Sequence, residues 1–224
     1  MPELQVRLDK LVLRLDHMGM RVEQAVIDAV QALRDRDTDG AAEVVERDEV
    51  VDREEVEVEQ ECIRLLALFQ PTATDLRTIC TIIKVNSDLE RIADLAASIA
   101  KKVKRVVQYD IDLDRYESLE VLIQLATDNL GRTVRMLSAT DTAVACNVIK
   151  LDKDVDKAYK NLVQSALNCE GGKPQGAEAA MALINLAKAL ERIGDHCTNI
   201  AEDIIFLRTG DIVRHSDVLG TSGE

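Results

Sequence analysis

The sequence predicts an all-α protein of six long helices, arranged as a tandem duplication of an antiparallel three-helix bundle. Three observations lead to this fold class. Aromatic residues make up 2% of the 224 residues, while Leu, Ala, Val and Ile are plentiful, a composition that favours helices over a β-sandwich. Apolar residues recur at alternating steps of three and four, which is the period of a bundle helix. Finally, the second half of the chain repeats the first.

The first two helices are predicted from apolar spacing and from residues that end helices. An apolar stripe with alternating steps of four and three covers the range 4–29, which predicts one long helix. The residues at 37–39 are Asp, Thr and Asp, which cap helix starts, so they separate this helix from the next. Pro71 cannot continue a helix and ends the second one.

The third helix closes the first repeat. Its apolar stripe covers the range 82–106, and an acidic connector, YDIDLD, follows at 109–114. A fourth helix then begins and the pattern starts again. The sequence therefore predicts a first repeat over residues 1–108 and a second over residues 109–224.

The duplication is visible in residue identities. A shift of 104 residues aligns 37–52 with 141–156, and seven of these 16 pairs are identical. For the third helix of each repeat the shift is 101 residues, and 89–100 matches 190–201 at seven of 12 positions. The shift changes in the turn between the second and third helices, which is Gln70-Pro71 in the first repeat and the segment 170–174 in the second.

Each repeat carries two pairs of acids spaced four residues apart, one on its second helix and one on its third. A spacing of four places both acids of a pair on the same helical face. In an antiparallel hairpin, residues equally far from the turn lie at the same height. The expected level pairs are Asp48 with Asp94 and Asp52 with Glu90 in the first repeat, and Asp152 with Asp195 and Asp156 with Glu191 in the second.

Four carboxylates at one height on packed helices would repel one another and lose hydration, so the pattern calls for a neutralising group. Oxygen ligands from adjacent helices suit a hard or borderline cation such as iron, manganese, magnesium, calcium or zinc. The alternative is that these acids are solvated or pair with bases, since Arg91 and Arg192 follow the two glutamates. His196 either joins the second group of acids or is a packing residue. The duplication and the level pairing favour metal.

Charge and missing motifs restrict the function further. The net charge of −13 argues against nucleic acid as a partner, because a phosphate backbone needs a basic surface. No apolar run is long enough to span a membrane, and the charged N-terminus does not resemble a leader, which predicts a cytoplasmic protein. No Glu-x-x-His, phosphate-binding glycine loop or nucleophile arrangement occurs, so the sequence predicts no catalytic residues and no organic cofactor.

Three stretches resemble the PhoU family of phosphate-transport accessory regulators. They are DEVVDREEVEVEQECIRLLALFQPTATDLRTI at 48–79, NSDLERIADLAASIA at 86–100 and ALERIGDHCTNIAEDIIF at 189–206. The combination of LERIxD with ALxQPxxxDLR is specific, and the resemblance extends over essentially the whole chain, duplication included.

The resemblance implies a cytoplasmic negative regulator of the phosphate-starvation response and of phosphate uptake. It links the ATPase subunit of a phosphate ABC transporter to a sensor histidine kinase, as a homodimer or higher oligomer without membrane insertion. It also implies multinuclear iron or zinc clusters, held by the eight paired acids. Glu55 resembles a further family acid, but its counterpart is Tyr159, so the two clusters are expected to differ. A carboxylate-bridged metalloenzyme and a metal-free helical scaffold are the alternatives.

Overall fold

Six long α-helices make up almost all of the structure, a computed structural model that describes residues 2–170 and 176–213. Within these ranges there is no strand, and the predicted all-α fold is confirmed. Residues 171–174, in the predicted turn of the second repeat, lie outside the described residues. The elements are α1 (Pro2–Asp35), α2 (Thr38–Phe69), α3 (Ala73–Gln108), the 3₁₀ turn η1 (Leu113–Arg115), α4 (Glu117–Ala139), α5 (Thr142–Glu170) and α6 (Gly176–Thr209).

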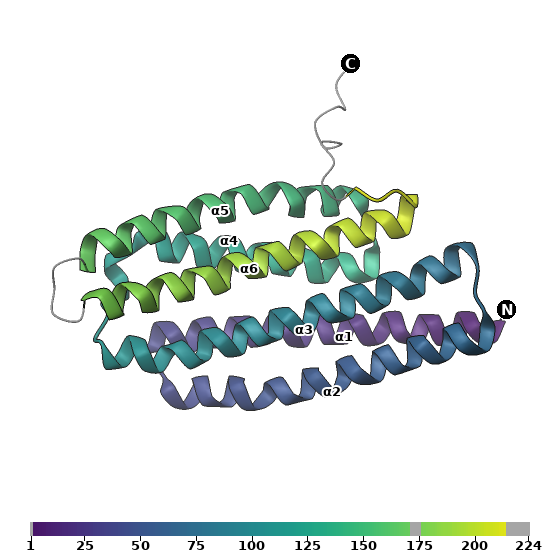
Figure 1. Ribbon diagram of the computed structural model, residues 1–224, viewed down its shortest axis with the longest axis horizontal. Coiled ribbons are helices and arrows are strands. Elements are labelled where there is room, and N and C mark those ends of the chain that lie inside the picture. The colour runs from purple at the N-terminus through teal and green to yellow at the C-terminus, as the bar shows by residue number, and fades with distance from the viewer. Residues whose placement is uncertain (1, 171–175, 214–224) are drawn as a thin grey trace, which may run out of the picture.

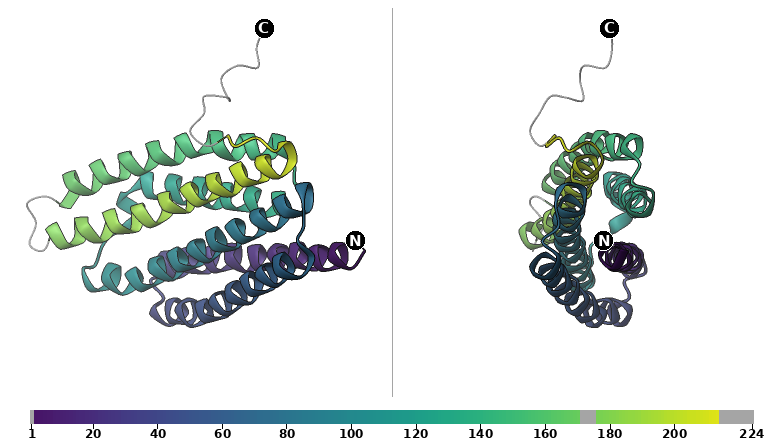
Figure 2. Two further views of the ribbon diagram at one scale, coloured as in Figure 1. Left: turned by 45° about the vertical axis from the view of Figure 1, so that its right-hand side comes forward. Right: turned by 90° about the vertical axis from the view of Figure 1, so that its right-hand side faces the viewer.

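The helices form two layers, and the two repeats lie side by side. α1, α2 and α3 pack on one another as the first three-helix bundle, and α4, α5 and α6 form the second. The repeats meet where α3 packs against α6 and α1 against α4. As a result, α2, α3, α6 and α5 follow one another in one curved layer, while α1 and α4 lie on the same side of it (Figures 1 and 2).

Equivalent aspartates begin the second helix of each repeat. Asp37 Oδ1 accepts hydrogen bonds from the backbone N–H groups of Asp39 and Gly40, both at 3.0 Å. Asp141 Oδ1 accepts one from Ala143 at 2.8 Å. These bonds satisfy N–H groups that a helix start leaves without partners. The predicted capping role of the 37–39 cluster is confirmed, and the duplication preserves it.

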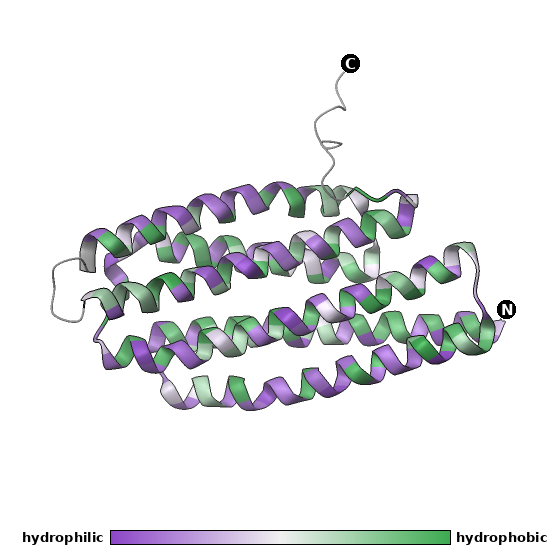
Figure 3. Cartoon of the chain, viewed as in Figure 1, coloured by the Kyte–Doolittle hydropathy of each residue, from purple (hydrophilic) through white to green (hydrophobic). Residues whose placement is uncertain are grey.

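Every helix has an apolar and a polar side, so purple and green alternate along each one (Figure 3). The apolar sides face inward, and the predicted stripes of α1 and α3 are buried: Met18, Val22, Leu89 and Ile99 are all fully inaccessible. The stripe of α5 is interrupted at one turn, where Asp152 stands between the buried Val148 and Val155. In the part of the chain that the structure describes, no helix is both long and apolar enough to cross a membrane.

Candidate metal centre

The first carboxylate group lies on the facing sides of α2 and α3. Its members differ in exposure: Asp52 and Asp94 are exposed, while the other three are half-buried. The group consists of Asp48, Asp52 and Glu55 on α2, and Glu90 and Asp94 on α3.

In the first group, the charge of one member of each predicted level pair raises the pKa of the other. Burial raises the pKa of Asp48, and the charges of Asp52 and Asp94 raise it further, against an opposing effect of Lys101. The pKa of Glu90 is raised by burial first and then by Asp94, with Asp52 among the smaller causes. Asp94 thus repels Asp48, and Asp52 repels Glu90, as expected of carboxylates at one height on an antiparallel hairpin.

Arg91 neutralises part of this first group. Its Nη1 lies 3.2 Å from Asp94 Oδ2, and its Nε lies 3.4 Å from Glu90 Oε2. The Arg91 side chain is 55% exposed, so these ion pairs are screened by solvent and contribute little to stability. The alternative interpretation, in which the acids pair with nearby bases, therefore describes Glu90 and Asp94. It does not reach Asp48, whose Oδ1 is buried without a hydrogen-bond partner.

The second carboxylate group consists of Asp152 and Asp156 on α5 with Glu191 and Asp195 on α6. Burial, followed by the charges of Asp195, Asp156 and Glu191, raises the pKa of Asp152 to about 6. Asp152 Oδ1 is buried and has no hydrogen-bond partner, like that of Asp48. The four acids are therefore close enough for their charges to act together, as the level pairing predicts.

Lys188 distinguishes the second group from the first. Its Nζ lies 2.6 Å from Glu191 Oε1 and 5.5 Å from the centre of the Tyr159 ring. The 101-residue shift makes Ser87 the counterpart of Lys188, and Tyr159 is the counterpart of Glu55. In the second repeat an ammonium group between an aromatic face and a glutamate thus stands where the first repeat has a serine and a further acid.

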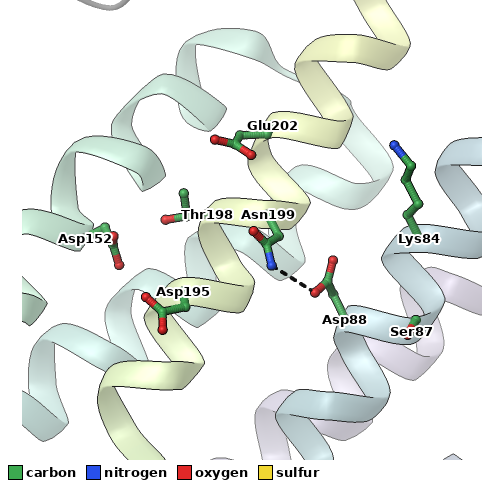
Figure 4. A pocket seen from close by; sticks show the side chains of 8 residues that line it. All are labelled: Lys84, Ser87, Asp88, Asp152, Asp195, Thr198, Asn199 and Glu202. Atoms are coloured by element: carbon green, nitrogen blue, oxygen red, sulfur yellow. Dashed lines mark hydrogen bonds between the residues drawn. The ribbon is translucent and has the colours of Figure 1, made fainter. Parts of the chain in front are cut away.

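A pocket of about 630 Å³ lies where the second group meets the first repeat (Figure 4). α5 contributes Asp152 to its lining, and α6 contributes Asp195 and Glu202. α3 supplies Lys84 and Asp88 from the opposite side. Asp152 and Asp195 of the second carboxylate group are therefore reached from this pocket at the junction of the repeats, and both repeats line it.

His196 belongs to this junction, where it makes a contact of the kind that the packing interpretation describes. Its Nδ1 lies 2.8 Å from Asp88 Oδ1, and Asn199 Nδ2 donates to the same oxygen at 3.3 Å. Lys84 Nζ lies 3.0 Å from Asp203 Oδ1 nearby. These contacts tie α3 to α6, and they turn His196 toward Asp88.

The donor atoms fit a cation, although the side chains are not gathered around one. Carboxylate oxygens on adjacent helices are hard ligands, and each group keeps one buried oxygen, on Asp48 and on Asp152, that has no partner. Within residues 2–170 and 176–213, however, no three His, Cys, Asp or Glu side chains form a group that could hold a metal ion. A bound cation would have to draw the carboxylates of each group together.

Sequence spacing did not identify four residues that shape these groups. Lys188 is three residues before Glu191, so its pairing could have been found from helix geometry. Asp88 acts across the repeat junction, which spacing within one hairpin does not reveal. Gly194 lies against the Asp152 carboxylate, and the buried Asn129 amide has no hydrogen-bond partner in the part of the chain that the structure describes. Both observations require the packed structure.

A model of the PhoU domain matches the chain twice, over residues 15–103 and 119–204. The chain belongs to the PhoU family. Both matches include the helices that carry the two carboxylate groups, so the duplicated hairpins are part of the family's pattern.

Named relatives are similar over nearly the full length. The phosphate-specific transport system accessory protein PhoU of Serratia marcescens is 32% identical over 221 residues, covering 95% of this chain and 87% of that protein. The PhoU homolog of Pseudomonas aeruginosa is 34% identical over 198 residues, covering 88% and 82%.

Solved structures of the family have the same fold. The crystal structure of PhoU from Pseudomonas aeruginosa superposes with a TM-score of 0.88 at 32% identity, covering 92% of this chain and 99% of that one. The crystal structure of the phosphate transport system regulatory protein PhoU from Streptococcus pneumoniae gives a TM-score of 0.85 at 25% identity, with coverage of 94% and 99%.

Proposed function

We propose that this PhoU-family protein is a cytoplasmic negative regulator of phosphate uptake and of the phosphate-starvation response. In this role it is an adaptor between the ATPase subunit of a phosphate ABC transporter and a phosphate-sensing histidine kinase, and it works as a homodimer or larger oligomer. The observation that carries the proposal is similarity to phosphate-specific transport system accessory proteins across both repeats. Long, rigid helices with extended polar faces suit a protein that contacts two partners.

Genetic deletion tests the regulatory part. A strain lacking the gene, grown in phosphate-rich medium, is expected to express a phosphate-regulon reporter that the parent strain represses. Return of the gene on a plasmid restores repression, while the empty plasmid serves as the control. Unchanged repression in the deletion strain would overturn the proposal.

Binding measurements test the adaptor part separately. The purified protein is expected to retain the transporter's ATPase subunit and the kinase's cytoplasmic region on an affinity matrix, but not an unrelated ABC ATPase. Retention of neither partner would leave a regulator that acts by another route and would contradict the adaptor mechanism.

We also propose that the two carboxylate groups bind metal ions, with iron or zinc as the first candidates. The support is the donor set together with the partnerless oxygens of Asp48 and Asp152. A cation there would add positive charge beyond that of Arg91 and Lys188 and would fix α2 to α3 and α5 to α6. Elemental analysis of protein purified without chelator is the test, and well under one ion per chain would contradict it.

A metal-free helical scaffold is the second candidate, because Arg91 and Lys188 already pair with three of the acids. It predicts that added iron or zinc does not change the melting temperature of the wild-type protein, and that Asp48→Asn and Asp94→Asn make no difference to this result. The metal-binding proposal predicts that the added metal raises the melting temperature of the wild-type protein and that these substitutions reduce the increase.

A further inference from the structure

One layer of the second bundle is unusually polar at its centre. Asp152 occupies a position in the apolar stripe of α5, and its Oδ1 lies against Gly194 of α6. A Cβ atom at position 194 would come within 3.0 Å of that oxygen and 3.2 Å of Val155 Cγ1. The missing side chain therefore lets the Asp152 carboxylate approach the α6 backbone closely, and its buried Oδ1 has no hydrogen-bond partner there.

α4 adds a buried amide at the same height. Asn129 is 0% exposed, and neither its Oδ1 nor its Nδ2 has a hydrogen-bond partner among the described residues. α4 ends at Ala139 and α5 begins at Thr142, so Asn129 and Asp152 are equally far from the turn that joins these antiparallel helices. α4 packs against both α5 and α6. Register thus places Asn129 in the layer of Asp152 and Gly194.

The first repeat confirms that these three positions share a layer. The counterparts of Asn129, Asp152 and Gly194 are Ala25, Asp48 and Ala93. All three line a single pocket of about 270 Å³. The aspartate is the same in both repeats, but only the second repeat supplies an amide from its first helix and removes the methyl group from its third.

A buried side chain near Asn129 also lies within range of the Asp152 charge. Thr133, one turn after Asn129, donates from its Oγ1 to the Asn129 backbone oxygen at 2.9 Å. The Cys197 thiol is fully buried, and burial raises its pKa to about 12. Thr133 and the charge of Asp152 are among the other groups that act on this thiol. Asn129, Thr133, Cys197 and Asp152 therefore occupy one region of the bundle interior.

Buried polar atoms without partners are costly, so such a layer indicates that something occupies it. A water molecule or a cation could bridge Asn129 Oδ1 and Asp152 Oδ1. The charges around Asp152 decide between them, because Asp195, Asp156 and Glu191 all act on it and none is positive. Lys188 forms its ion pair with Glu191 and acts on Asp195 only through its charge, while the Asp152 and Asp195 side chains line the open pocket (Figure 4).

We propose that Asn129 supplies an amide oxygen to a divalent cation held by Asp152 and Asp195, completing a site that Lys188 deprives of Glu191. The site takes a hard or borderline divalent cation, since all three donors are oxygens. The first repeat has no equivalent side-chain donor, because the methyl side chain of Ala25 carries no oxygen. This inference rests on the proposed metal binding and assigns to it a ligand outside the paired acids.

The test isolates the second site. In protein carrying Asp48→Asn and Asp94→Asn, which removes the first site, manganese(II) binding is measured by titration calorimetry and by the electron paramagnetic resonance signal of free ion. Asn129→Leu, of similar volume but without oxygen, is expected to weaken binding on the order of 10- to 100-fold, the usual effect of changing a group that supports a metal site. Asn129→Asp keeps an oxygen and is expected to bind at least as tightly as Asn129.

The reciprocal change supplies the matched control in the first repeat. In protein carrying Asp152→Asn and Asp195→Asn, the pair Ala25→Asn and Ala93→Gly recreates the polar layer around Asp48. Tighter manganese binding than in the same protein without the pair is expected. Far-UV circular dichroism verifies that each variant is folded, and unchanged affinity in the grafted protein counts against the role of the amide.

The outcomes separate the two proposals. One possible result is that the parent binds manganese, that Asp152→Asn abolishes this binding and that Asn129→Leu leaves it unchanged. In that case the layer holds only water and Asn129 is not a ligand, but the proposal of metal binding stands. If neither the parent nor the wild-type protein binds manganese, iron(II) or zinc, metal binding fails and the inference fails with it. Loss of affinity in Asn129→Leu with retention in Asn129→Asp supports the inference.

Discussion

Lys188 Nζ lies 2.6 Å from Glu191 Oε1, one turn away on α6, and this contact makes the two carboxylate groups chemically different. Glu191 is only 8% exposed, so Lys188 provides most of its compensation for burial. The hydrogen bond to Glu191 raises the pKa of Lys188, which keeps the lysine charged. At the equivalent position of the first repeat, Ser87 offers no charge.

Lys188→Ser is therefore expected to destabilise the metal-free protein and to strengthen its response to divalent cations. Leaving Glu191 buried without its partner costs about 1–3 kcal/mol. Manganese(II) should restore more stability to this variant than to the wild type, because the freed carboxylate becomes a ligand. Thermal unfolding with chelator and with manganese measures both effects. The exposed Lys104→Ser is the control, and equal behaviour of the two variants would contradict the prediction.

The raised pKa of Asp152, about 6 against an ordinary 3.8, predicts how stability depends on pH. The folded state holds the proton more tightly than the unfolded chain does, so stability falls as pH rises through this window and stays lower above it. In chelator, Asp152→Asn is expected to exceed the wild type at about pH 7.5 by on the order of 1 kcal/mol, a value reduced for partial solvation. That corresponds to about 2–4 °C in Tm.

The same measurement at about pH 4 supplies the control for Asp152. There the wild-type carboxyl is mostly protonated when folded, so the difference between the two proteins should nearly disappear. A difference that is independent of pH would show that Asn stabilises this position for a reason other than charge.

The fold follows from the sequence because its determinants are local. Alternating apolar steps, the acids at 37–39 and Pro71 fix where helices begin and end. The duplication then requires two similar bundles. What spacing could not provide is the arrangement of the repeats, since the contact of α3 with α6 depends on complementary surfaces far apart in the chain.

For the candidate site, too, the sequence predicts what depends on spacing within one helical hairpin. Counting outward from each turn correctly pairs Asp48 with Asp94 and Asp152 with Asp195 as neighbours. It says nothing of rotamers, so it could not show whether the carboxylates converge. It also overlooks residues whose role depends on a neighbour from another helix. Gly194 is one, because it matters only through the Asp152 oxygen that lies against it.

The equivalent caps of α2 and α5 predict equivalent losses. Asp37→Ala and Asp141→Ala each remove a side-chain acceptor from the start of a helix, which should cost about 0.5–2 kcal/mol. Asp112→Ala is a suitable control, because Asp112 precedes η1 without forming a side-chain cap bond. Denaturant unfolding gives the three values, and a loss for Asp112→Ala as large as the others would show that charge rather than capping is being measured.

The Asp88 carboxylate joins the repeats, so its removal is expected to weaken the junction of α3 and α6. Asp88→Ala takes the acceptor from His196 and Asn199, two side chains that are partly buried on the opposite repeat. The expected cost is about 1–3 kcal/mol, seen as a lower midpoint in thermal unfolding. Asp154→Ala, an exposed position on α5, should change stability by less than about 0.5 kcal/mol. If Asp88→Ala also separates unfolding into two transitions, the junction couples the bundles; if it behaves like Asp154→Ala, apolar packing alone holds the repeats together.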